Sequence, residues 1–247
     1  MNEPLVSVVL SSFNRPTLIR DAIESVLAQT WPNVECIIAD DWSRDDVHEV
    51  IASYHEAFKA KGWRCITVVP KGPPTDHERQ FGQRCAIGIN EGMRHIKGEF
   101  VAFLCDDDML LPHSIEVRAT QLVDHAYMNV VYGKLRACIS DIPVPGIHTE
   151  ATPNCRHDDR CYWEPEPIKR AANRLDHGQF LVRNRATLPQ WPEGTFRAGG
   201  EDFTCDDATF LWSLEQHGFG PFWPVDAVVI QKRYHSFAHL KAPARRE

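Results

Sequence analysis

The chain has no long hydrophobic run and no excess of positive charge. No stretch of its 247 residues approaches the roughly 18 apolar residues that a membrane-spanning helix needs. Lys and Arg number 27 against 34 Asp and Glu, so the formal net charge is −7. This balance disfavours a protein held on nucleic acid mainly by phosphate neutralisation. The N-terminus also lacks the basic start and long apolar stretch of a signal peptide, and we therefore expect a cytoplasmic protein without a membrane span.

Two glycine-rich nucleotide-binding motifs are missing as well. No G-x-G-x-x-G follows the first predicted strand and no Walker A sequence occurs, so dinucleotide-binding and P-loop classes lose their main support. Paired cysteines are also scarce. The close pair Cys155 and Cys161 has a spacing that fits no common zinc site. We interpret the cysteines in apolar runs as reduced core thiols, with a metal site at Cys155 and Cys161 as the alternative.

Strand-like and helix-like segments alternate through residues 1–132. The strand-like runs are short and rich in β-branched residues, and the segments between them carry apolar residues at helical spacing. This alternation predicts parallel strands joined by helices, with the ligand at the carboxyl ends of the strands. The expected strands are 5–10, 34–39, 65–69, 99–104 and 129–132, and the expected helices begin at 16 and cover 43–61, 78–96 and 112–125.

The second half is less regular. Residues 141–168 hold five prolines with little periodicity, which predicts a long loop or lid. Further along, the pattern predicts strands over 180–182 and 225–230 and a helix over 206–217. The last segment, 232–247, is basic, and we expect a C-terminal tail there.

Three adjacent carboxylates, Asp106, Asp107 and Asp108, directly follow the apolar run EFVAFLC. Carboxylates this close repel one another, and a bound cation relieves the repulsion. Mg²⁺ and Mn²⁺ suit oxygen-rich sites, commonly with one or two carboxylates plus phosphate oxygens. The triplet therefore predicts a divalent metal site, with a solvated acidic turn that caps the next helix as the alternative.

Two further acidic groups stand before predicted helices. Asp40 and Asp41 precede Trp42-Ser43, where a carboxylate can accept hydrogen bonds from a base or ribose. The stretch GGEDFTCDD at 199–207 offers candidates for a general base. Helix capping is the alternative for both groups. Among the tryptophans, Trp163 and Trp191 are candidates for stacking on a sugar ring, with packing as the alternative.

Taken together, these stretches resemble family-2 glycosyltransferases with the GT-A fold. The resemblance is carried by SVVLSSFNRPTLIRDAIESVLAQTWPNVECIIADDWSRD and RCAIGINEGMRHIKGEFVAFLCDDDMLLP, where the acidic triplet takes the place of that family's metal-binding D-x-D motif. LDHGQFLVR and GGEDFTCDDATFLW are most similar to the spore-coat polysaccharide glycosyltransferase branch. The similarity covers roughly residues 4–232.

The resemblance implies an α/β GT-A fold, with a mostly parallel central sheet flanked by helices and a Rossmann-like N-terminal half. It implies one domain over 1–231, divided into a nucleotide-binding half (1–132) and an acceptor-binding half (133–231), followed by the basic tail 232–247. The commoner family pattern has an acid where Cys105 stands, so we assign the ribose-facing role to Asp106.

The resemblance also implies roles for individual residues. The nucleotide-binding residues would be Ser11, Ser12, Phe13, Arg15, Asp41, Arg84 and Asp106. The ligands of Mn²⁺ or Mg²⁺ would be Asp107, Asp108 and His235. Asp207 would be the catalytic base, with Asp202 as the alternative. The donor-sugar or acceptor side would be lined by Asp176, His177, Glu201 and, from its aromatic character, Trp163.

The implied reaction moves a sugar from a UDP- or dTDP-type nucleoside diphosphate sugar to an acceptor hydroxyl, with inversion. The metal ion neutralises charge on the departing diphosphate, and the base takes the proton of the hydroxyl. Residues 141–168 or 232–247 would close over the site. The alternatives are a nucleotidyltransferase and a non-catalytic nucleotide- or carbohydrate-binding module. The acceptor (polysaccharide, lipid carrier, small metabolite or modified nucleobase) and the oligomeric state stay open.

Overall fold

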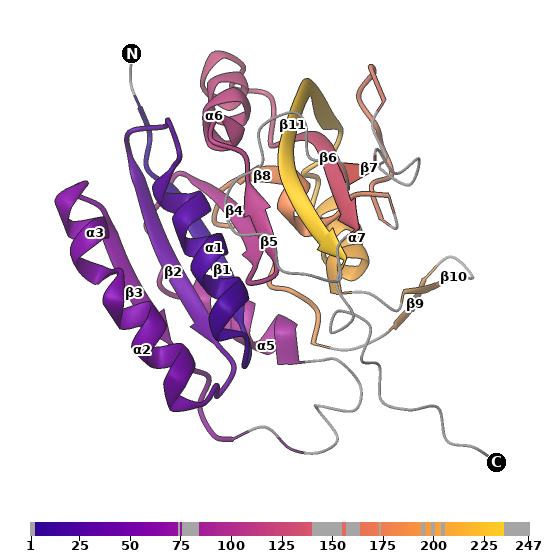
Figure 1. Cartoon of the computed structure of the whole chain (residues 1–247). Coiled ribbons are helices and arrows are strands. Elements are labelled where there is room, and N and C mark those ends of the chain that lie inside the picture. The colour runs from indigo at the N-terminus through magenta and orange to yellow at the C-terminus, as the bar shows by residue number, and fades with distance from the viewer. Residues whose placement is uncertain are drawn as a thin grey trace.

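The computed structural model describes residues 3–73, 75, 84–139, 155–156, 164–172, 174–193, 196–198, 201–203 and 206–234. Strands and helices alternate through the first half, as the hydrophobic pattern predicts (Figure 1). The elements of this half are β1 (Val6–Ser12), α1 (Pro16–Leu27), β2 (Val34–Asp40), α2 (Asp45–Ser53), α3 (His55–Ala60), β3 (Arg64–Val68), α5 (Arg84–Met93), β4 (Phe100–Cys105), β5 (Asp108–Leu110) and α6 (Ser114–Asp124).

The described part of the second half contributes further strands and an α-helix. Its elements are β6 (Val130–Ile139), β7 (Cys155–Arg156), the 3₁₀ helix η1 (His177–Gln179), β8 (Phe180–Arg183), β9 (Phe196–Ala198), β10 (Glu201–Phe203), α7 (Asp206–Gln216) and β11 (Phe222–Tyr234). The strand expected over 225–230 is thus much longer, and the domain boundary that we expected at residue 231 falls inside β11. The residues 141–154 and 157–163 of the expected lid lie outside the described part of the chain.

The helix expected over 43–61 is divided in two. At Tyr54 the backbone amide donates to the carbonyl of Ile51, three residues back, which tightens the turn and separates α2 from α3. The short strand β5 was not expected, because the pattern there indicated a turn. It forms by antiparallel pairing with β11, a partner far along the chain.

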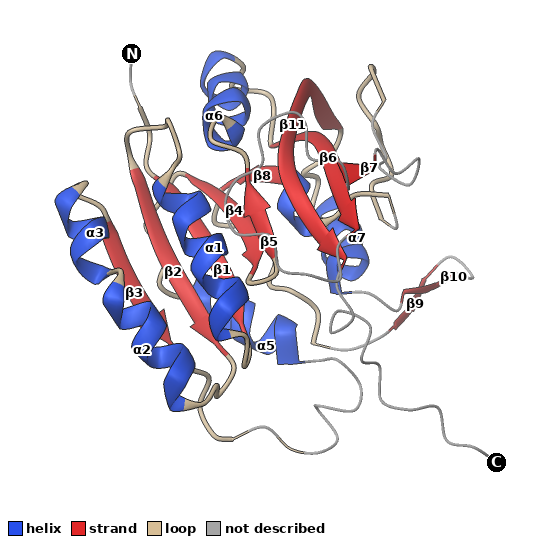
Figure 2. Cartoon of the chain, viewed as in Figure 1, coloured by secondary structure: helices blue, strands red, loops and turns tan. Residues whose placement is uncertain are grey.

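Within the described residues, the main sheet has nine strands in the order β3-β2-β1-β4-β8-β6-β11-β5, with β7 added beside β6 (Figure 2). Strands β3, β2, β1 and β4 are parallel, and β6 is parallel to β11. Strand β8 runs antiparallel between β4 and β6, and β5 is antiparallel to β11. A separate two-stranded sheet pairs β9 with β10. The expected mostly parallel sheet is confirmed, with β8, β5 and β7 running antiparallel to their neighbours.

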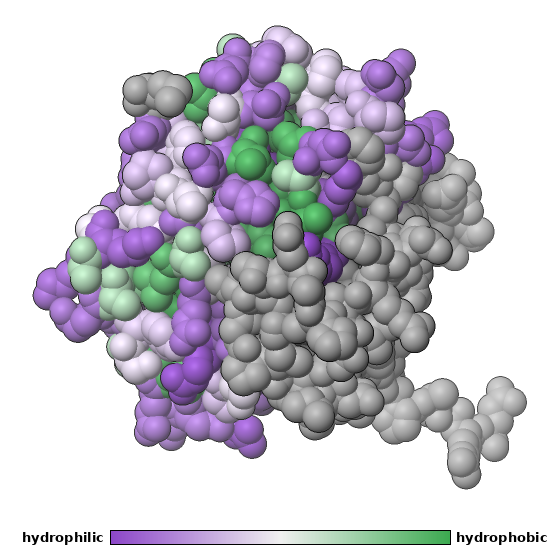
Figure 3. All heavy atoms as spheres, turned by 45° about the horizontal axis from the view of Figure 1, so that its top comes forward, coloured by the Kyte–Doolittle hydropathy of each residue, from purple (hydrophilic) through white to green (hydrophobic). Residues whose placement is uncertain are grey.

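Helices cover both faces of this sheet. Because side chains alternate along a strand, Val8 and Leu10 pack with α1, α2 and α6, whereas Val9 packs on the opposite face with α5 and α7. The indole of Trp191 is buried in this second cluster and stacks on Phe210 at 4.5 Å, so the packing alternative holds for Trp191. Figure 3 shows one face of the molecule, where hydrophobic areas lie among hydrophilic residues.

A buried arginine ties α6 to η1. The Arg118 side chain is 0% exposed and donates to the Ser114 carbonyl at 2.9 Å, to Ser114 Oγ at 2.6 Å and to the Gly178 carbonyl at 3.2 Å. Burial lowers the pKa of Arg118 to about 9. Arg118→Met removes these three hydrogen bonds, and we expect the free energy of unfolding to fall by about 3 kcal/mol. Urea unfolding with an unchanged m-value measures this, and a loss below about 1 kcal/mol contradicts the expectation.

Candidate functional site

The carboxyl ends of three strands meet at one edge of the sheet. Strand β1 lies between β2 and β4 and is parallel to both, so Ser12 stands opposite Asp40 and Ser11 opposite Cys105. The polar segments that follow these strands therefore lie side by side, although they come from residues 13–15, 41–44 and 106–108. This edge is where open α/β sheets bind ligands.

Arg15 bridges two members of the acidic triplet. Its Nη1 atom donates to Asp106 at 2.7 Å and to Asp107 at 2.8 Å, and Asp106 also accepts the amide of Phe13 at 2.9 Å. Burial raises the pKa of Asp106 to about 7, against the opposing effect of Arg15. Burial alone would lower the pKa of Arg15, but Asp106 and Asp107 raise it above its ordinary value. Arg15 thus relieves the charge repulsion that the sequence indicated.

The two aspartates at the end of β2 make different contacts. Asp40 is buried, accepts the amide of Ser43 at 3.0 Å and lies 3.2 Å from Nε2 of His48. Asp40 therefore closes the turn before α2, whose N-cap residue is Arg44 and has no side-chain cap. Asp41 is also buried, and its amide donates to the carbonyl of Ser12 at 2.9 Å, which ties the ends of β1 and β2 together.

Two aromatic side chains stay exposed at these strand ends. Phe13 is 37% exposed, and Trp42 is 43% exposed with a positive φ of 58°. For a bulky residue this backbone conformation is an outlier, of the kind found at functional sites. The Trp42 indole donates to the carbonyl of Pro70 at 3.0 Å, which holds the turn against β3. The sequence pattern gave no signal of this strained conformation.

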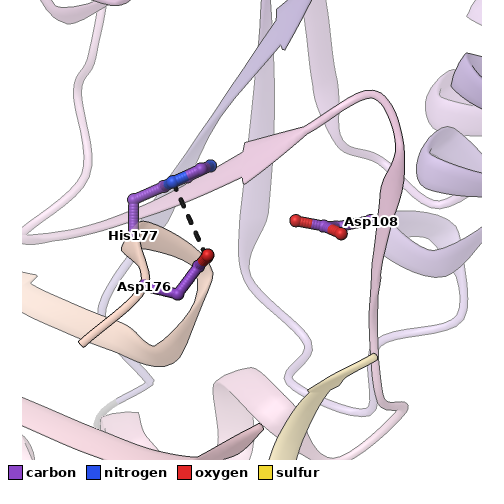
Figure 4. A group of neighbouring side chains, drawn as sticks. All are labelled: Asp108, Asp176 and His177. Atoms are coloured by element: carbon purple, nitrogen blue, oxygen red, sulfur yellow. Dashed lines mark ion pairs between the residues drawn. The ribbon is translucent and has the colours of Figure 1, made fainter. Parts of the chain in front are cut away.

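A second group of side chains gathers beside the triplet. Asp108 on β5 and Asp176-His177 at the start of η1 each place one ligand atom within 4.8 Å of the others (Figure 4). Nδ1 of His177 lies 3.6 Å from Oδ1 of Asp176. The sequence assigned Asp108 to the metal and Asp176 and His177 to the sugar side, whereas the fold brings all three together.

Lys232 completes this group, and we had assigned it to the C-terminal tail. Strand β11 pairs Lys232 with Asp108, so both side chains stand opposite one another. Nζ of Lys232 forms an ion pair with Asp176 and lies 3.8 Å from Oδ2 of Asp108. We call Asp108, Asp176, His177 and Lys232 the β5–η1 cluster. No motif in the sequence marks Lys232, because only its pairing with β5 brings it here.

Charges in the β5–η1 cluster shift one another strongly. Burial, with Asp107 and Asp176, raises the pKa of Asp108 well above its ordinary value, although Lys232 opposes this. Burial also tends to raise the pKa of Asp176, but His177 and Lys232 lower it to about 2. The pKa of Lys232 is raised by Asp108 and Asp176, which outweigh the effect of burial.

A thiol adjoins the cluster at the end of β4. Sγ of Cys105 is 3.5 Å from Oγ of Ser11, which in turn is 3.9 Å from Sγ of Cys85. A hydrogen bond with Cys85 and the charge of His177 lower the pKa of Cys105 well below its ordinary value, despite burial. The Cys105 sulfur and Asp176 in turn raise the pKa of His177, against burial. The position where the commoner family pattern has an acid is thus electrostatically coupled to His177.

The first turn of α7 carries the expected base. Oδ1 of Asp207 accepts the amide of the next residue, Ala208, at 2.9 Å. Burial and the nearby Asp176 raise the pKa of Asp207, while His177 and Lys232 oppose the rise. The charges of the β5–η1 cluster therefore shift the pKa of Asp207, although Asp207 comes from a different element.

Several expected site residues, or their side chains, lie outside the described part of the chain. Trp163 and His235 lie outside the described residues. Arg84 begins α5 and Glu201 and Asp202 lie on β10, but only their backbones belong to the described part of the chain.

Comparison with known proteins now places the chain. Residues 7–182 match the family "Glycosyl transferase family 2", which is well over half of the chain. The chain belongs to glycosyl transferase family 2. An uncharacterised glycosyltransferase of Rickettsia typhi is 31% identical over 113 residues, covering 46% of this chain and 30% of that protein. EpsE of Bacillus subtilis, named a glycosyltransferase, is 26% identical over 162 residues, covering 62% of this chain and 54% of its own length.

Solved structures support the expected GT-A fold. TarS of S. aureus (residues 1–349, in complex with UDP-GlcNAc) aligns with a TM-score of 0.67 at 16% identity, covering 97% of this chain and 61% of that one. The mannosyltransferase PcManGT of Pyrobaculum calidifontis, in complex with GDP-Man and Mn²⁺, aligns with a TM-score of 0.59 at 14% identity, covering 95% of this chain and 57% of that one. At these identities the likeness establishes the fold alone.

The chain spans 30% and 54% of the lengths of the two relatives named above. Within the described residues, no helix has both the length and the apolar character that crossing a membrane requires. The spore-coat branch stays a prediction.

Proposed function

We propose that this family-2 glycosyltransferase moves a sugar from a UDP- or dTDP-type nucleoside diphosphate sugar to an acceptor hydroxyl, with inversion. The observation that carries the proposal is the gathering of charge at the carboxyl edge of the sheet. Carboxylates from β5, η1 and the triplet meet there with Arg15 and Lys232, and Asp207 on α7 is electrostatically coupled to them. Such a charged edge suits a diphosphate donor.

The nucleotide would be held at the ends of β1, β2 and β4. Ser11, Ser12 and Phe13 line the end of β1, and we assign Asp41 to the base and Asp106 to the ribose. Arg84 would approach the base or phosphate. Arg15 is a positioning residue in this scheme, because its guanidinium holds Asp106 and Asp107 together at 2.7 and 2.8 Å.

The donor atoms on this edge suit Mn²⁺ or Mg²⁺. Asp107 and Asp108 would hold the ion, and His235 is proposed as a further ligand. Asp176 and His177 add an oxygen and an imidazole nitrogen within 4.8 Å of Asp108. Carboxylate oxygens suit both ions, and imidazole is a ligand of first-row transition metals. When bound, the ion neutralises negative charge on the departing diphosphate.

The chain's own residues would carry the proton transfer. The acceptor hydroxyl attacks the anomeric carbon from the face opposite the diphosphate, and Asp207 takes the proton of that hydroxyl. A raised pKa makes Asp207 a stronger base than an exposed aspartate. Asp202 is the alternative base. Asp176, His177, Glu201 and Trp163 would line the donor-sugar or acceptor side.

Product analysis tests the reaction class. Incubation with UDP- and dTDP-sugars and Mn²⁺ is expected to release the nucleoside diphosphate, slowly to water and faster with an acceptor. Release of pyrophosphate identifies a nucleotidyltransferase instead. Tight binding of the nucleotide sugar without release of either product identifies a non-catalytic module.

Thermal unfolding can identify both the nucleoside of the donor and the required metal ion. We expect the matching nucleoside diphosphate with Mn²⁺ to stabilise the fold by about 2.7 kcal/mol at a concentration 100 times Kd. The nucleotide alone should stabilise it less, because the triplet carboxylates then face the diphosphate without the ion. Equal stabilisation with and without Mn²⁺ contradicts metal-assisted donor binding. Acceptor screening across polysaccharides, lipid carriers and small metabolites follows once the donor is known.

A further inference from the structure

A lysine ammonium lies against the same two carboxylates that could hold a metal ion in the β5–η1 cluster. In Figure 4 the side chains of Asp108, Asp176 and His177 converge, with ligand atoms within 4.8 Å of one another. The ammonium of Lys232 is hydrogen-bonded to Asp176 and 3.8 Å from Oδ2 of Asp108. Both carboxylates of this potential metal site therefore already share one cation.

The sheet holds the backbone of Lys232 in place, while its side-chain ammonium can move. Lys232 lies on β11, which is paired with β6 on one side and with β5 on the other, so its backbone is held from both sides. The pairing sets Lys232 opposite Asp108. Its side chain is 27% exposed, whereas that of Asp108 is 1% exposed. A four-carbon stem with this exposure can swing its ammonium toward solvent while the carboxylate stays in place.

Electrostatics make the ammonium and a divalent ion exclusive occupants. Buried carboxylates need a compensating charge, which Lys232 supplies to Asp108 and Asp176. A divalent ion bound to the same two carboxylates would stand within a few ångströms of the ammonium, where two positive charges repel strongly at low effective dielectric. Only one of the two cations can hold these carboxylates at a time.

We propose that Lys232 is a displaceable internal cation, and that Mn²⁺ or Mg²⁺ reaches Asp108 and Asp176 only by displacing its ammonium. The resting protein keeps the β5–η1 cluster neutralised by its own side chain. Binding of the ion moves the ammonium off Asp176 and toward solvent. The inference rests on the proposed function for its location, but it concerns ion binding and is tested without donor or acceptor.

Calorimetric titration with Mn²⁺, in the absence of nucleotide, tests the competition. Lys232→Met should bind Mn²⁺ about tenfold or more tightly than the wild type, because the competing charge is gone. Lys232→Arg keeps the charge and should bind no more tightly than the wild type. Lys134→Met is the matched control, since Lys134 pairs with the exposed Asp226. The gain should vanish in Lys232→Met/Asp108→Asn. Mn²⁺ binding by Lys232→Met that is equal to or weaker than that of the wild type overturns the proposal.

A measurement on the wild-type protein answers the same question if Lys232→Met does not fold. Acetylation by an amine-reactive ester, followed at Lys232 by peptide mass spectrometry and normalised to Lys134, should accelerate at saturating Mg²⁺. Unchanged or slower acetylation of Lys232 overturns displacement. Sugar transfer that persists beside such a negative result leaves the proposed function standing, whereas displacement without any transfer supports this inference alone.

Discussion

Asp207→Asn is expected to lower the rate of sugar transfer by about 10²–10⁴-fold, the usual contribution of a positioned general base. Donor affinity should change little, because the proposed base acts on the acceptor hydroxyl and not on the nucleotide. Steady-state kinetics with the identified donor and acceptor measure the loss in kcat, and calorimetry with the nucleoside diphosphate measures donor affinity. Asp226→Asn is the control, since Asp226 is exposed and pairs with Lys134 away from the β5–η1 cluster.

The pH profile distinguishes a base from a structural carboxylate. Burial raises the pKa of Asp207, so its carboxylate is ionised only above that raised value. The rate should fall as the pH drops through this pKa, because the protonated form cannot accept a proton, and the low-pH limb should disappear in Asp207→Asn. Near-normal kcat in Asp207→Asn together with loss of activity in Asp202→Asn moves the base to Asp202.

Asp107→Asn is expected to weaken Mn²⁺ dependence and transfer together. Removal of one preorganised charge contact to the diphosphate site costs about 10²–10³-fold in kcat, and raising the Mn²⁺ concentration should recover part of the loss. The Asp107 side chain is 15% exposed and shares Nη1 of Arg15 with Asp106. Its loss should therefore leave Asp106 paired and the fold intact. Rates measured across a Mn²⁺ titration give both the apparent ion affinity and the maximal rate.

Glu91→Gln is a matched control for this variant. Glu91 lies on α5, its side chain is 17% exposed, close to the value for Asp107, and it is paired with Arg94 just after the end of the helix. It removes one carboxylate of similar exposure from outside the proposed ion site, so rate and Mn²⁺ dependence should match the wild type. If Asp107→Asn behaves as Glu91→Gln does, Asp107 is not a metal ligand.

The first half of the fold was largely predictable from the sequence. The apolar run that includes Val8, Val9 and Leu10 predicted β1, and Pro16 predicted the start of α1. The acidic triplet was also readable as a group, because its members are adjacent in the chain. The division of roles within it was not, since it depends on Arg15 bridging Asp106 and Asp107 and on Asp108 entering β5.

The β5–η1 cluster could not be predicted from the sequence, because its members come from segments that are far apart in the chain. Lys232 looked like part of a basic tail, because its neighbours in the chain include Arg233. Only the family resemblance pointed to Asp176 and His177, and it assigned them to the sugar side. The strained turn at Trp42 and the contact of Cys105 with Ser11 likewise left no pattern in the sequence.

By itself, the order of residues determined the alternation of strands and helices, the polar ends of β1, β2 and β4, and the family. These are local properties, because hydrophobic periodicity and adjacent charges act over a few residues. Only the tertiary structure decided that β5 pairs with β11, that η1 lies beside them, and that Lys232 neutralises Asp108 and Asp176. The pairing of β5 with β11 joins segments more than a hundred residues apart, and Lys232 and Asp176 are 56 residues apart. These contacts arise from packing of the whole sheet, which no short stretch of sequence encodes.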